Sequence, residues 1–303
     1  LAICAYAVGA HEGIVFIRSE YPEAMARMHQ AVDEAVSAGA LGESIFESGY
    51  SLNVRIFPGM GSYVCGEETA MLNAIEGFRG EVRLRPPYPT DVGLYGKPTV
   101  VDNVETLVSV PWIIQHGGDA YAALGTAQSS GTKAMCLNHG FVKPGIVEIN
   151  FGMPLRELIE SHARTSAHDS ELIAVITGGP MGSVVPPEQW DVPICYTAME
   201  QRGLTLGHGG LVAIHDDTDL RQLLRNWIGF MADESCGKCT PCRIGSKRLQ
   251  ELFEDFIRTN GQVALHESSF EEVERLLGVI QQGSLCAFGQ QIPRPIQQLI
   301  ERF

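Results

Sequence analysis

The chain has 303 residues, 45% of them hydrophobic, and its formal net charge at pH 7 is −14. A chain of this length can bury more than one hydrophobic core, and we expect three domains. The negative charge opposes binding to nucleic acid or to an anionic membrane surface, and no apolar run reaches the length that spans a bilayer. We therefore expect a soluble chain. Three of its eight cysteines cluster within seven residues, which favours a metal site in a reducing compartment, so we expect a cytoplasmic protein, either free or on the cytoplasmic face of a membrane complex.

The first part of the chain alternates between strand and helix patterns. Residues 13–18 (GIVFIR) are typical of a buried strand, and a helical pattern begins near Pro22. A second strand is predicted at residues 54–57 (VRIF), and a helix follows over residues 67–76. This alternation indicates an α/β domain, which we place at residues 1–127.

A glycine-rich loop joins the second predicted strand to its helix. Gly66 lies at the end of this loop, where a glycine lets the backbone approach a cofactor closely. Glu67 and Glu68 begin the helix, where they either cap it or accept hydrogen bonds from a ribose, a carboxamide or a flavin N–H. The glycine spacing matches neither a dinucleotide-binding fingerprint nor a Walker loop, so this loop alone does not identify a cofactor.

Residues 80–98 are rich in proline, arginine and glycine, and we predict no regular structure there. Ordered loops of this length usually bind a ligand, and Arg83, Arg85 and Tyr88 could supply phosphate contacts and a stacking surface. The motif VDNVET that follows could bind the edge of a ring or simply start a helix through an Asx turn. Its polar candidates are Asp102, Asn103 and Thr106.

The rest of the chain changes character twice. Short strand patterns surround one predicted helix at residues 154–161, which indicates a compact β-rich module over residues 128–216. After this module, apolar residues recur at helical spacing, so residues 217–303 are predicted to form a helical bundle. The predicted strands of the module lie at residues 134–140, 145–151, 171–179 and 210–216.

Three cysteines lie within seven residues of one another, in the segment ESCGKCTPCRIG. Cys236, Cys239 and Cys242 have the spacing CxxCxxC, which lets three thiolates occupy three corners of one cubane cluster. Cys286, in the segment GSLCAFG, is the best candidate for the fourth ligand, because a helix–loop–helix excursion can return the chain to the same place. We predict a [4Fe–4S] cluster, with zinc as the alternative, although structural zinc sites more often use two separated CxxC pairs.

Local helix chemistry supports the cluster assignment. Thr240 and Pro241 suit the N-cap and the first helical position of a helix, whose N-terminal amides would then point toward the cluster. Arg243 adds positive charge beside the thiolates, which would stabilise a reduced cluster and raise its potential. The remaining cysteines lie singly in apolar contexts, where we predict small buried side chains: Cys4, Cys65, Cys136 and Cys195.

Three motifs occur in a fixed order along the chain: GSYVCGEETAMLNAIEG, RPPYPTDVGLYGKPTVVDNVETL and ESCGKCTPCRIG. Together they resemble the NADH-oxidising flavoprotein subunit of respiratory NADH dehydrogenase. The same family includes the diaphorase subunits of NAD-reducing and electron-bifurcating hydrogenases and of NAD-dependent formate dehydrogenases. The resemblance implies a flavin-binding α/β domain, a β-grasp module of the soluble-ligand-binding type, and a helical bundle that carries a [4Fe–4S] cluster.

The resemblance also implies roles for single residues. Glu67 and Glu68 match the loop that lines the pocket for FMN and nicotinamide, and we assign the catalytic step to them. Three matched positions depart from the family's usual residues, with Arg for Lys, Tyr for Phe and Asp for Asn, and we expect the site to survive these changes. The other matched positions contact the flavin or the dinucleotide in the family: Gly66, Arg85, Tyr88, Asp102, Asn103 and Thr106.

The implied reaction is hydride transfer between the nicotinamide C4 and the flavin N5, followed by single-electron transfer through the cluster. The implied partners are a thioredoxin-like [2Fe–2S] subunit and a larger iron–sulfur or catalytic subunit. The parent complex would be a formate dehydrogenase, a hydrogenase or an NADH dehydrogenase, and the segment GSLCAFGQQIPRP favours the first two. Glu67 and Glu68 would repel a 2′-phosphate near the ribose, so we expect NAD rather than NADP.

The family's glycine-rich flavin loop (GRGGAGF) is expected to precede residue 1 and does not occur in this sequence. The first eight residues read as the end of an apolar helix, so we expect the natural start to lie further upstream, unless another polypeptide supplies that half of the flavin site. The alternative function is accordingly a cluster-bearing relay or scaffold subunit that lacks its own working flavin site.

Overall fold

The computed structural model describes residues 1–163, 170–258 and 267–301. Short parts of the predicted β-rich module and of the predicted bundle therefore lie outside the described residues. The chain divides into two compact units, residues 1–115 and residues 116–303. Within the described residues, no helix is both long enough and apolar enough to cross a membrane.

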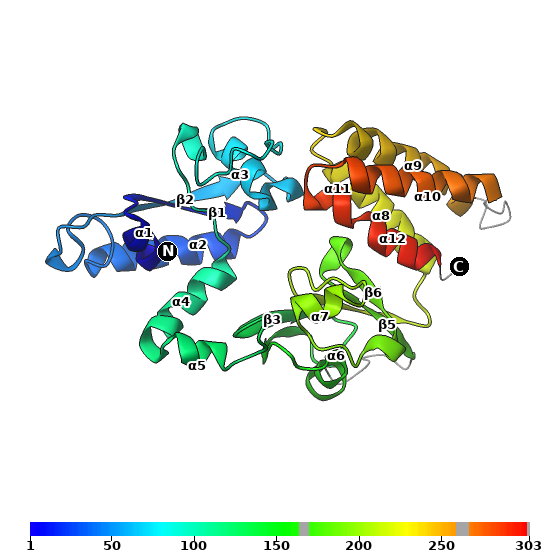
Figure 1. The fold of residues 1–303 in the computed structure, drawn as a ribbon, viewed down its shortest axis with the longest axis horizontal. Helices are drawn as coiled ribbons and strands as arrows, with labels where there is room; N and C mark the ends of the chain where they lie inside the picture. Colours follow the sequence, from blue (N-terminus) through cyan, green and yellow to red (C-terminus); the bar gives the residue numbers. More distant parts are fainter. Residues whose placement is uncertain (164–169, 259–266, 302–303) are drawn as a thin grey trace. The chain divides into compact units, whose positions relative to one another are not determined.

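The first unit is built on a parallel pair of strands. β1 (Glu12–Arg18) and β2 (Asn53–Gly59) pair along their whole length, and the rings of Phe16 and Phe57 stack 5.8 Å apart. α2 (Pro22–Ser37) lies against β2, as Figure 1 shows. Proline suits the first position of this helix because its ring fixes φ near the helical value.

Three further helices complete the first unit: α1 (Ala2–Val8), α3 (Glu68–Ile75) and α4 (Val104–His116), whose last residue already belongs to the second unit. α3 follows the glycine-rich loop and buries Ala70 and Leu72 almost completely. The loop predicted to lack regular structure contains only one short 3₁₀ turn, at Leu94–Gly96.

Arg83 holds this long loop against α3. Its guanidinium donates hydrogen bonds to Asn73 Oδ1 at 2.8 Å, to Glu76 Oε2 at 2.8 Å and to the Gly93 carbonyl at 3.2 Å. The fork of five N–H groups in arginine can satisfy three such acceptors at once. The side chain that the sequence suggests as a phosphate contact therefore orders the loop itself.

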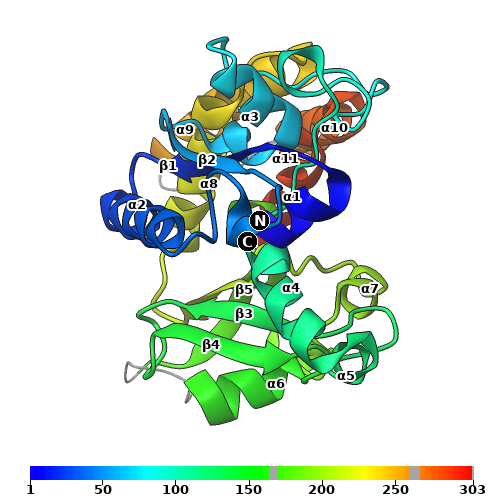
Figure 2. The ribbon, with the colours of Figure 1, turned by 90° about the vertical axis from the view of Figure 1, so that its left-hand side faces the viewer.

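The second unit begins with α5 (Gly118–Ala122) and is centred on a five-stranded sheet. Its strand order is β4–β3–β7–β5–β6, in which β3 and β7 run parallel and the other neighbours run antiparallel. Figure 2 shows β3 and β4 side by side. The strands are β3 (Thr132–Leu137), β4 (Gly145–Asn150), β5 (Leu172–Thr177), β6 (Ser183–Val185) and β7 (Gly210–His215).

The core of the sheet lies on one face, beneath α6 (Leu155–Glu157) and the π-helical turn that continues it to Ala163. Met135, Leu158 and Leu211 have no exposed surface there. α7 (Tyr196–Glu200) adds Met199 to the same cluster. Side chains of a strand alternate between faces, so every second residue of β3 reaches this core.

That alternation corrects one prediction. Cys136 is exposed, because its neighbours Met135 and Leu137 are the β3 residues that face the core. Cys65 and Cys195 are buried as predicted, and Cys4 is half-buried. Residue context alone did not distinguish the two faces of the strand.

In the described residues after 216, five helices follow the sheet, and α9 packs against both α8 and α10. Asp219 caps the first of them by accepting hydrogen bonds from the backbone N–H groups of Arg221 and Gln222, both at 3.0 Å. The last helix reaches the sheet, where Gln298 Oε1 accepts a hydrogen bond from the Val184 N–H at 2.8 Å. The five are α8 (Leu220–Glu234), α9 (Thr240–Arg258), α10 (Glu267–Gly283), α11 (Ala287–Gln291) and α12 (Pro293–Ile300).

The position of the sheet's core can be tested by substituting one buried and one exposed aliphatic residue, Leu211 and Ile146. We expect Leu211→Ala to lower the free energy of unfolding by about 2–5 kcal/mol, because it leaves a cavity in the central strand. Ile146, which is 77% exposed on the edge strand β4, is the matched control, and Ile146→Ala should change stability by no more than about 0.5 kcal/mol. Equal losses in urea denaturation of the two variants would contradict this assignment of the core.

Candidate cofactor sites

The acidic pair stands at the start of α3. Glu67 is the N-cap residue, and its Oε2 accepts hydrogen bonds from the Ala70 N–H at 2.9 Å and from Thr69 Oγ1 at 2.5 Å. A carboxylate at this position satisfies free amides and the helix dipole. The capping role considered from the sequence is therefore observed for Glu67, and its carboxylate is fixed in place.

Arg85 joins both carboxylates of the pair. Its Nη1 lies 2.5 Å from Glu68 Oε1, and its Nη2 lies 3.8 Å from Glu67 Oε1. The side chain of Glu68 is 31% exposed, against 17% for that of Glu67. Glu68 is thus the more accessible carboxylate, and Tyr88, three residues beyond Arg85, has an exposed ring.

A small cavity of about 230 Å³ adjoins this region between α3 and the long loop. Most of its lining is apolar, and the Arg83 side chain contributes the charged group. The lining residues are Thr69, Leu72, Arg83, Leu84, Pro87, Pro89 and Val92. The cavity therefore shares its walls with the segments that hold Glu67, Glu68 and Arg85.

The VDNVET motif starts α4. Asn103 Oδ1 accepts a hydrogen bond from the Thr106 N–H at 2.7 Å, and Asp102 Oδ1 accepts one from the Asn103 N–H at 2.9 Å. The first bond is an N-cap at the start of α4, so the motif starts a helix, which the sequence left open as the simpler explanation, although through a cap rather than an Asx turn. In the part of the chain that the structure describes, these two side chains accept hydrogen bonds from backbone N–H groups of their own motif, and none is shown to the acidic pair.

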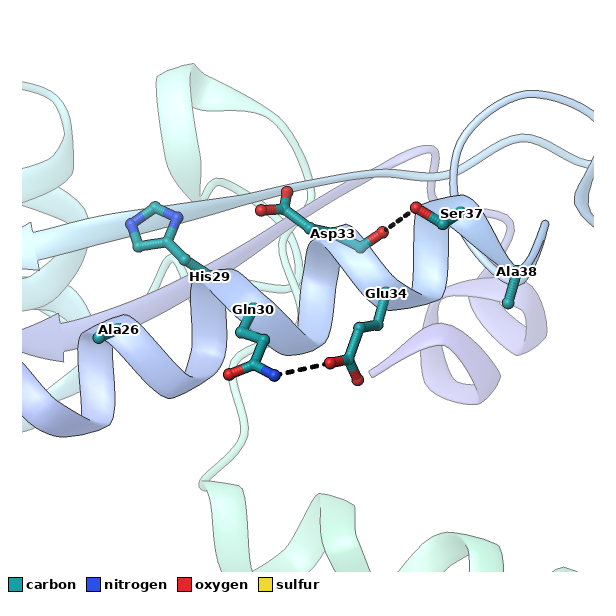
Figure 3. Close-up of a pocket in the computed structure, with 7 residues that line it drawn as sticks. All are labelled: Ala26, His29, Gln30, Asp33, Glu34, Ser37 and Ala38. Atoms are coloured by element: carbon teal, nitrogen blue, oxygen red, sulfur yellow. Dashed lines mark hydrogen bonds between the residues drawn. The ribbon is translucent and has the colours of Figure 1, made fainter.

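A larger hollow, of about 800 Å³, lies on the outer face of α2 (Figure 3). Its side chains bond along the helix, from Gln30 Nε2 to Glu34 Oε1 at 2.7 Å and from Ser37 Oγ to the Asp33 carbonyl at 2.8 Å. This hollow is a shallow, open helix surface, and none of the predicted site residues lines it. Size alone therefore does not locate the chemistry.

The four predicted cluster cysteines come from two parts of the second unit. Cys236 and Cys239 lie in the loop between α8 and α9, Cys242 lies in the first turn of α9, and Cys286 is the N-cap residue of α11. Cys242 and Cys286 are buried, and the other two are half-buried. α9 begins at Thr240, one residue earlier than a Thr240 cap would place it.

Cys242 and Cys286 both have a raised pKa. Burial raises the pKa of Cys242 and of Cys286, and the neighbouring Cys236 and Cys239 thiols raise both further. The Cys286 thiol is thus influenced by thiols far earlier in the chain, as expected if the chain brings them near each other. Within the described residues, no three His, Cys, Asp or Glu side chains are placed closely enough to hold a single metal ion.

Hydrogen-bond donors surround these sulfurs. The Leu285 N–H donates to Cys239 Sγ at 3.3 Å, and Ser235 Oγ lies 3.2 Å from Cys242 Sγ. The N–H groups of Phe288 and Gly289 bond to Cys286 and counteract the rise in its pKa that burial causes. Donors of this kind stabilise thiolates bound to iron, so the residues present fit a [4Fe–4S] cluster. Sequence reasoning missed all four donors, although a serine directly before the CxxCxxC motif was visible.

Positive charge also gathers here. Residues 235–250 and 275–300 contain no aspartate or glutamate, although the chain as a whole is strongly acidic. Arg243 Nη1 donates to the Gly237 carbonyl at 2.9 Å, so its charge lies at the loop that carries the first cysteines. Lys247 is paired with Asp233 at 3.0 Å, and both side chains are exposed, so this lysine belongs to a solvated helix face.

Two family models match this chain. Residues 1–112 match the Nuo51 FMN-binding domain, which includes the acidic pair and the VDNVET motif. Residues 222–303 match the NADH-ubiquinone oxidoreductase-F iron–sulfur binding region, which includes all four cysteines.

Curated relatives cover the whole chain. It is 39% identical over 303 residues to the NADP-reducing hydrogenase subunit HndC of Solidesulfovibrio fructosivorans, of which it spans 61%. It is also 39% identical to the second F-type NADH-quinone oxidoreductase subunit of Rhizobium meliloti (strain 1021), of which it spans 71%. Thus the chain is shorter than either relative.

Solved structures give the same result for the fold. The crystal structure of an NAD⁺-reducing [NiFe]-hydrogenase in the H₂-reduced state superposes with a TM-score of 0.87 at 31% identity, over 99% of this chain and 49% of that one. Sequence, family models and fold agree, and the chain belongs to the family of F-type NADH-quinone oxidoreductase subunits, with that family's FMN-binding domain and iron–sulfur binding region.

Proposed function

We propose that this chain is a diaphorase-type electron-transfer subunit, which passes electrons between NAD(H), FMN and a [4Fe–4S] cluster within a multi-subunit oxidoreductase. The observation that carries this proposal is the presence, in one chain, of the FMN-binding domain and of four cysteines in one shared environment. FMN, when bound, exchanges a hydride with the nicotinamide, and the cluster carries one electron at a time. The task of the protein is to bind and orient the reactants.

The acidic pair would divide this work. Glu67 Oε2 is occupied by the Ala70 N–H and the Thr69 hydroxyl, so we assign Glu67 the positioning of the helix start. Glu68 is more accessible, and its carboxylate can accept hydrogen bonds from ribose hydroxyls or a carboxamide. Arg85 neutralises part of this negative charge. Its guanidinium lies beside Glu68, so it could bind the pyrophosphate of a nucleotide whose ribose contacts Glu68.

The remaining predicted contacts would use atoms that the helix start does not occupy. Asn103 Oδ1 and the Thr106 N–H are taken up by the helix cap, which leaves Asn103 Nδ2 and Thr106 Oγ1 to face a flavin. Gly66 precedes the acidic pair and has nothing within 4 Å of where a Cβ would lie, so its backbone is open to a ligand. The exposed ring of Tyr88 suits stacking on a base.

We also propose that Cys236, Cys239, Cys242 and Cys286 are the ligands of the cluster. The buried pair would shield it from water, and the half-buried pair would leave one side open. Their thiols must lose protons on binding iron, and the surrounding N–H and O–H donors favour the thiolate form.

The three-domain division, at residues 1–127, 128–216 and 217–303, stays our proposal, and so does the β-grasp identity of the middle module. In support, β3 and β7, which are the first and last strands of the sheet along the chain, are parallel neighbours inside it. The helix α6 and its π-helical continuation come between β4 and β5 in the sequence. The module needs no cofactor of its own in this proposal.

A partner protein would meet the open side of the cluster. Ile244 and Leu285 are 57% and 43% exposed beside the cysteines, in sequence segments without aspartate or glutamate. Acidic residues outside these segments pair with Lys247 and Arg248 but leave the Arg243 guanidinium on a backbone carbonyl. Apolar residues within a basic surround suit an electron-transfer partner, for which we propose a thioredoxin-like [2Fe–2S] subunit and a larger iron–sulfur or catalytic subunit. We place the complex in the cytoplasm, because eight unpaired cysteines suit a reducing compartment.

The proposal is tested by spectra of the purified protein before and after addition of NADH. We expect the broad visible absorbance of an iron–sulfur cluster, an EPR signal that appears on reduction, and acid-released FMN close to one per chain. A cluster without flavin would instead make this chain a relay or scaffold subunit, and a colourless protein that contains zinc would refute the cluster itself.

Gly289 tests whether the close packing around Cys242 and Cys286, called here the cluster cradle, holds the cluster. A Cβ at this position would lie 2.1 Å from Ser284 Oγ and 3.5 Å from the Cβ of Cys242, so Gly289→Ala should displace residues around two ligands. We expect iron to be retained roughly tenfold less well in the presence of a chelator. Gly278 is the control, because nothing lies within 4 Å of its Cβ position in α10, and Gly278→Ala should leave retention unchanged. Equal retention in both variants would refute the cradle.

Nucleotide choice tests the role of Glu68. We expect a KM for NADPH about tenfold or more above that for NADH, because Glu68 would repel the 2′-phosphate. Glu68→Gln should narrow this difference, whereas Glu23→Gln, which alters an exposed ion pair on α2, should not. A lower KM for NADPH in the unaltered protein would show that this chain follows the NADP-reducing relative instead.

A further inference from the structure

Ser235 lies directly before the first cluster cysteine, at the end of α8. Its Oγ is 3.2 Å from Cys242 Sγ, seven residues further along the chain. The same oxygen is 3.3 Å from the N–H of Gly237. A single hydroxyl therefore bridges the loop that holds the first two cysteines and the helix that holds the third.

The direction of these two hydrogen bonds follows from the groups involved. The Gly237 N–H can only donate, so Ser235 Oγ accepts there and keeps its own proton for another acceptor. A thiolate that binds iron has no proton, so it can only accept. Ser235 must then donate its O–H to Cys242 Sγ when the cluster is in place.

This donor differs in kind from the others. Leu285, Phe288 and Gly289 bond to cysteine sulfurs through backbone N–H groups, which remain when the side chain changes. Among the donors to these four sulfurs that the described residues show, Ser235 supplies the side-chain hydroxyl. The hydrogen bond from Ser235 is accordingly the one that a substitution of the side chain removes.

We propose that Ser235 sets the reduction potential of the [4Fe–4S] cluster through its hydrogen bond to Cys242. Reduction adds one electron, supplied by reduced flavin, and increases the negative charge on the sulfurs. The O–H···S bond then strengthens, no covalent bond is broken, and the proton stays on Ser235 Oγ. The bond therefore stabilises the reduced form and raises the potential. This inference rests on the proposed function, since it requires a cluster on these cysteines.

The surroundings make such a bond effective. Cys242 is only 8% exposed, so water does not replace a lost donor readily. Hydrogen bonds to the sulfurs are among the factors that set cluster potentials. Ser235 would act as a positioning and tuning residue rather than as a ligand.

The test is a redox titration followed by EPR, on the purified protein with its cluster. We expect Ser235→Ala to lower the equilibrium constant for reduction of the cluster roughly threefold to tenfold, where tenfold corresponds to about 59 mV for one electron. Ser235→Thr, which keeps the hydroxyl, should stay close to the unaltered protein.

The matched control is Ser246→Ala in the same helix as Cys242. Ser246 is fully buried, but its Oγ is 3.4 Å from the Arg243 carbonyl, with no bond to sulfur recorded. Its loss should leave the midpoint potential unchanged. If Ser235→Ala does not retain its cluster, Ser235→Gly removes the same hydroxyl and takes its place in the titration.

The outcomes separate this inference from the proposed function. An unaltered protein without any cluster signal would overturn both. A normal cluster whose potential is the same in Ser235→Ala as in the unaltered protein would overturn the inference alone, and so would an equal shift in the alanine and threonine variants. A shift confined to the variants that lack the hydroxyl supports it.

Discussion

The close packing of α9 on α10 is the constraint on which the cysteine site depends. A Cβ on Gly245 would lie 2.7 Å from Ile280 Cγ1, and one on Gly283 would lie 2.7 Å from Pro241 Cγ. Two helices can approach this closely only where one of them lacks a side chain. Because the start of α9 meets the end of α10, the chain returns beside the CxxCxxC segment just before Cys286, the residue that we propose as the fourth ligand.

The nucleotide side of the molecule depends on a different balance, between capping and binding. Glu67 is held by the Ala70 N–H and the Thr69 hydroxyl, and Arg83 is held by Asn73, Glu76 and the Gly93 carbonyl, so both side chains are fixed before any ligand arrives. Glu68 and Arg85 contact each other near the surface instead. Such a pair can exchange its internal contact for contacts to a ligand at modest cost, because exposed ion pairs contribute little stability.

Much of this arrangement could be predicted from the sequence, where the signal was local. The CxxCxxC spacing, the helix after the glycine-rich loop and the strands of the middle module follow from short patterns. What could not be predicted depends on tertiary contacts. The three-residue strand β6 is too short to show a period, the exposed face of Cys136 depends on which side of β3 meets the core, and the Ser235 bond depends on how α9 follows its loop.

The contact between α12 and β6 has a consequence for how the gene could be divided. Val184 lies on an edge strand, and its outward N–H is satisfied by Gln298, which stands in for a neighbouring strand. Removal of the last helices would expose the unpaired backbone groups of the edge strand β6, and exposed strand edges promote self-association. Splitting the polypeptide between residues 216 and 220, in evolution or by engineering, would therefore carry a risk of aggregation. The sheet and the final helices are expected to stay on one polypeptide for this reason.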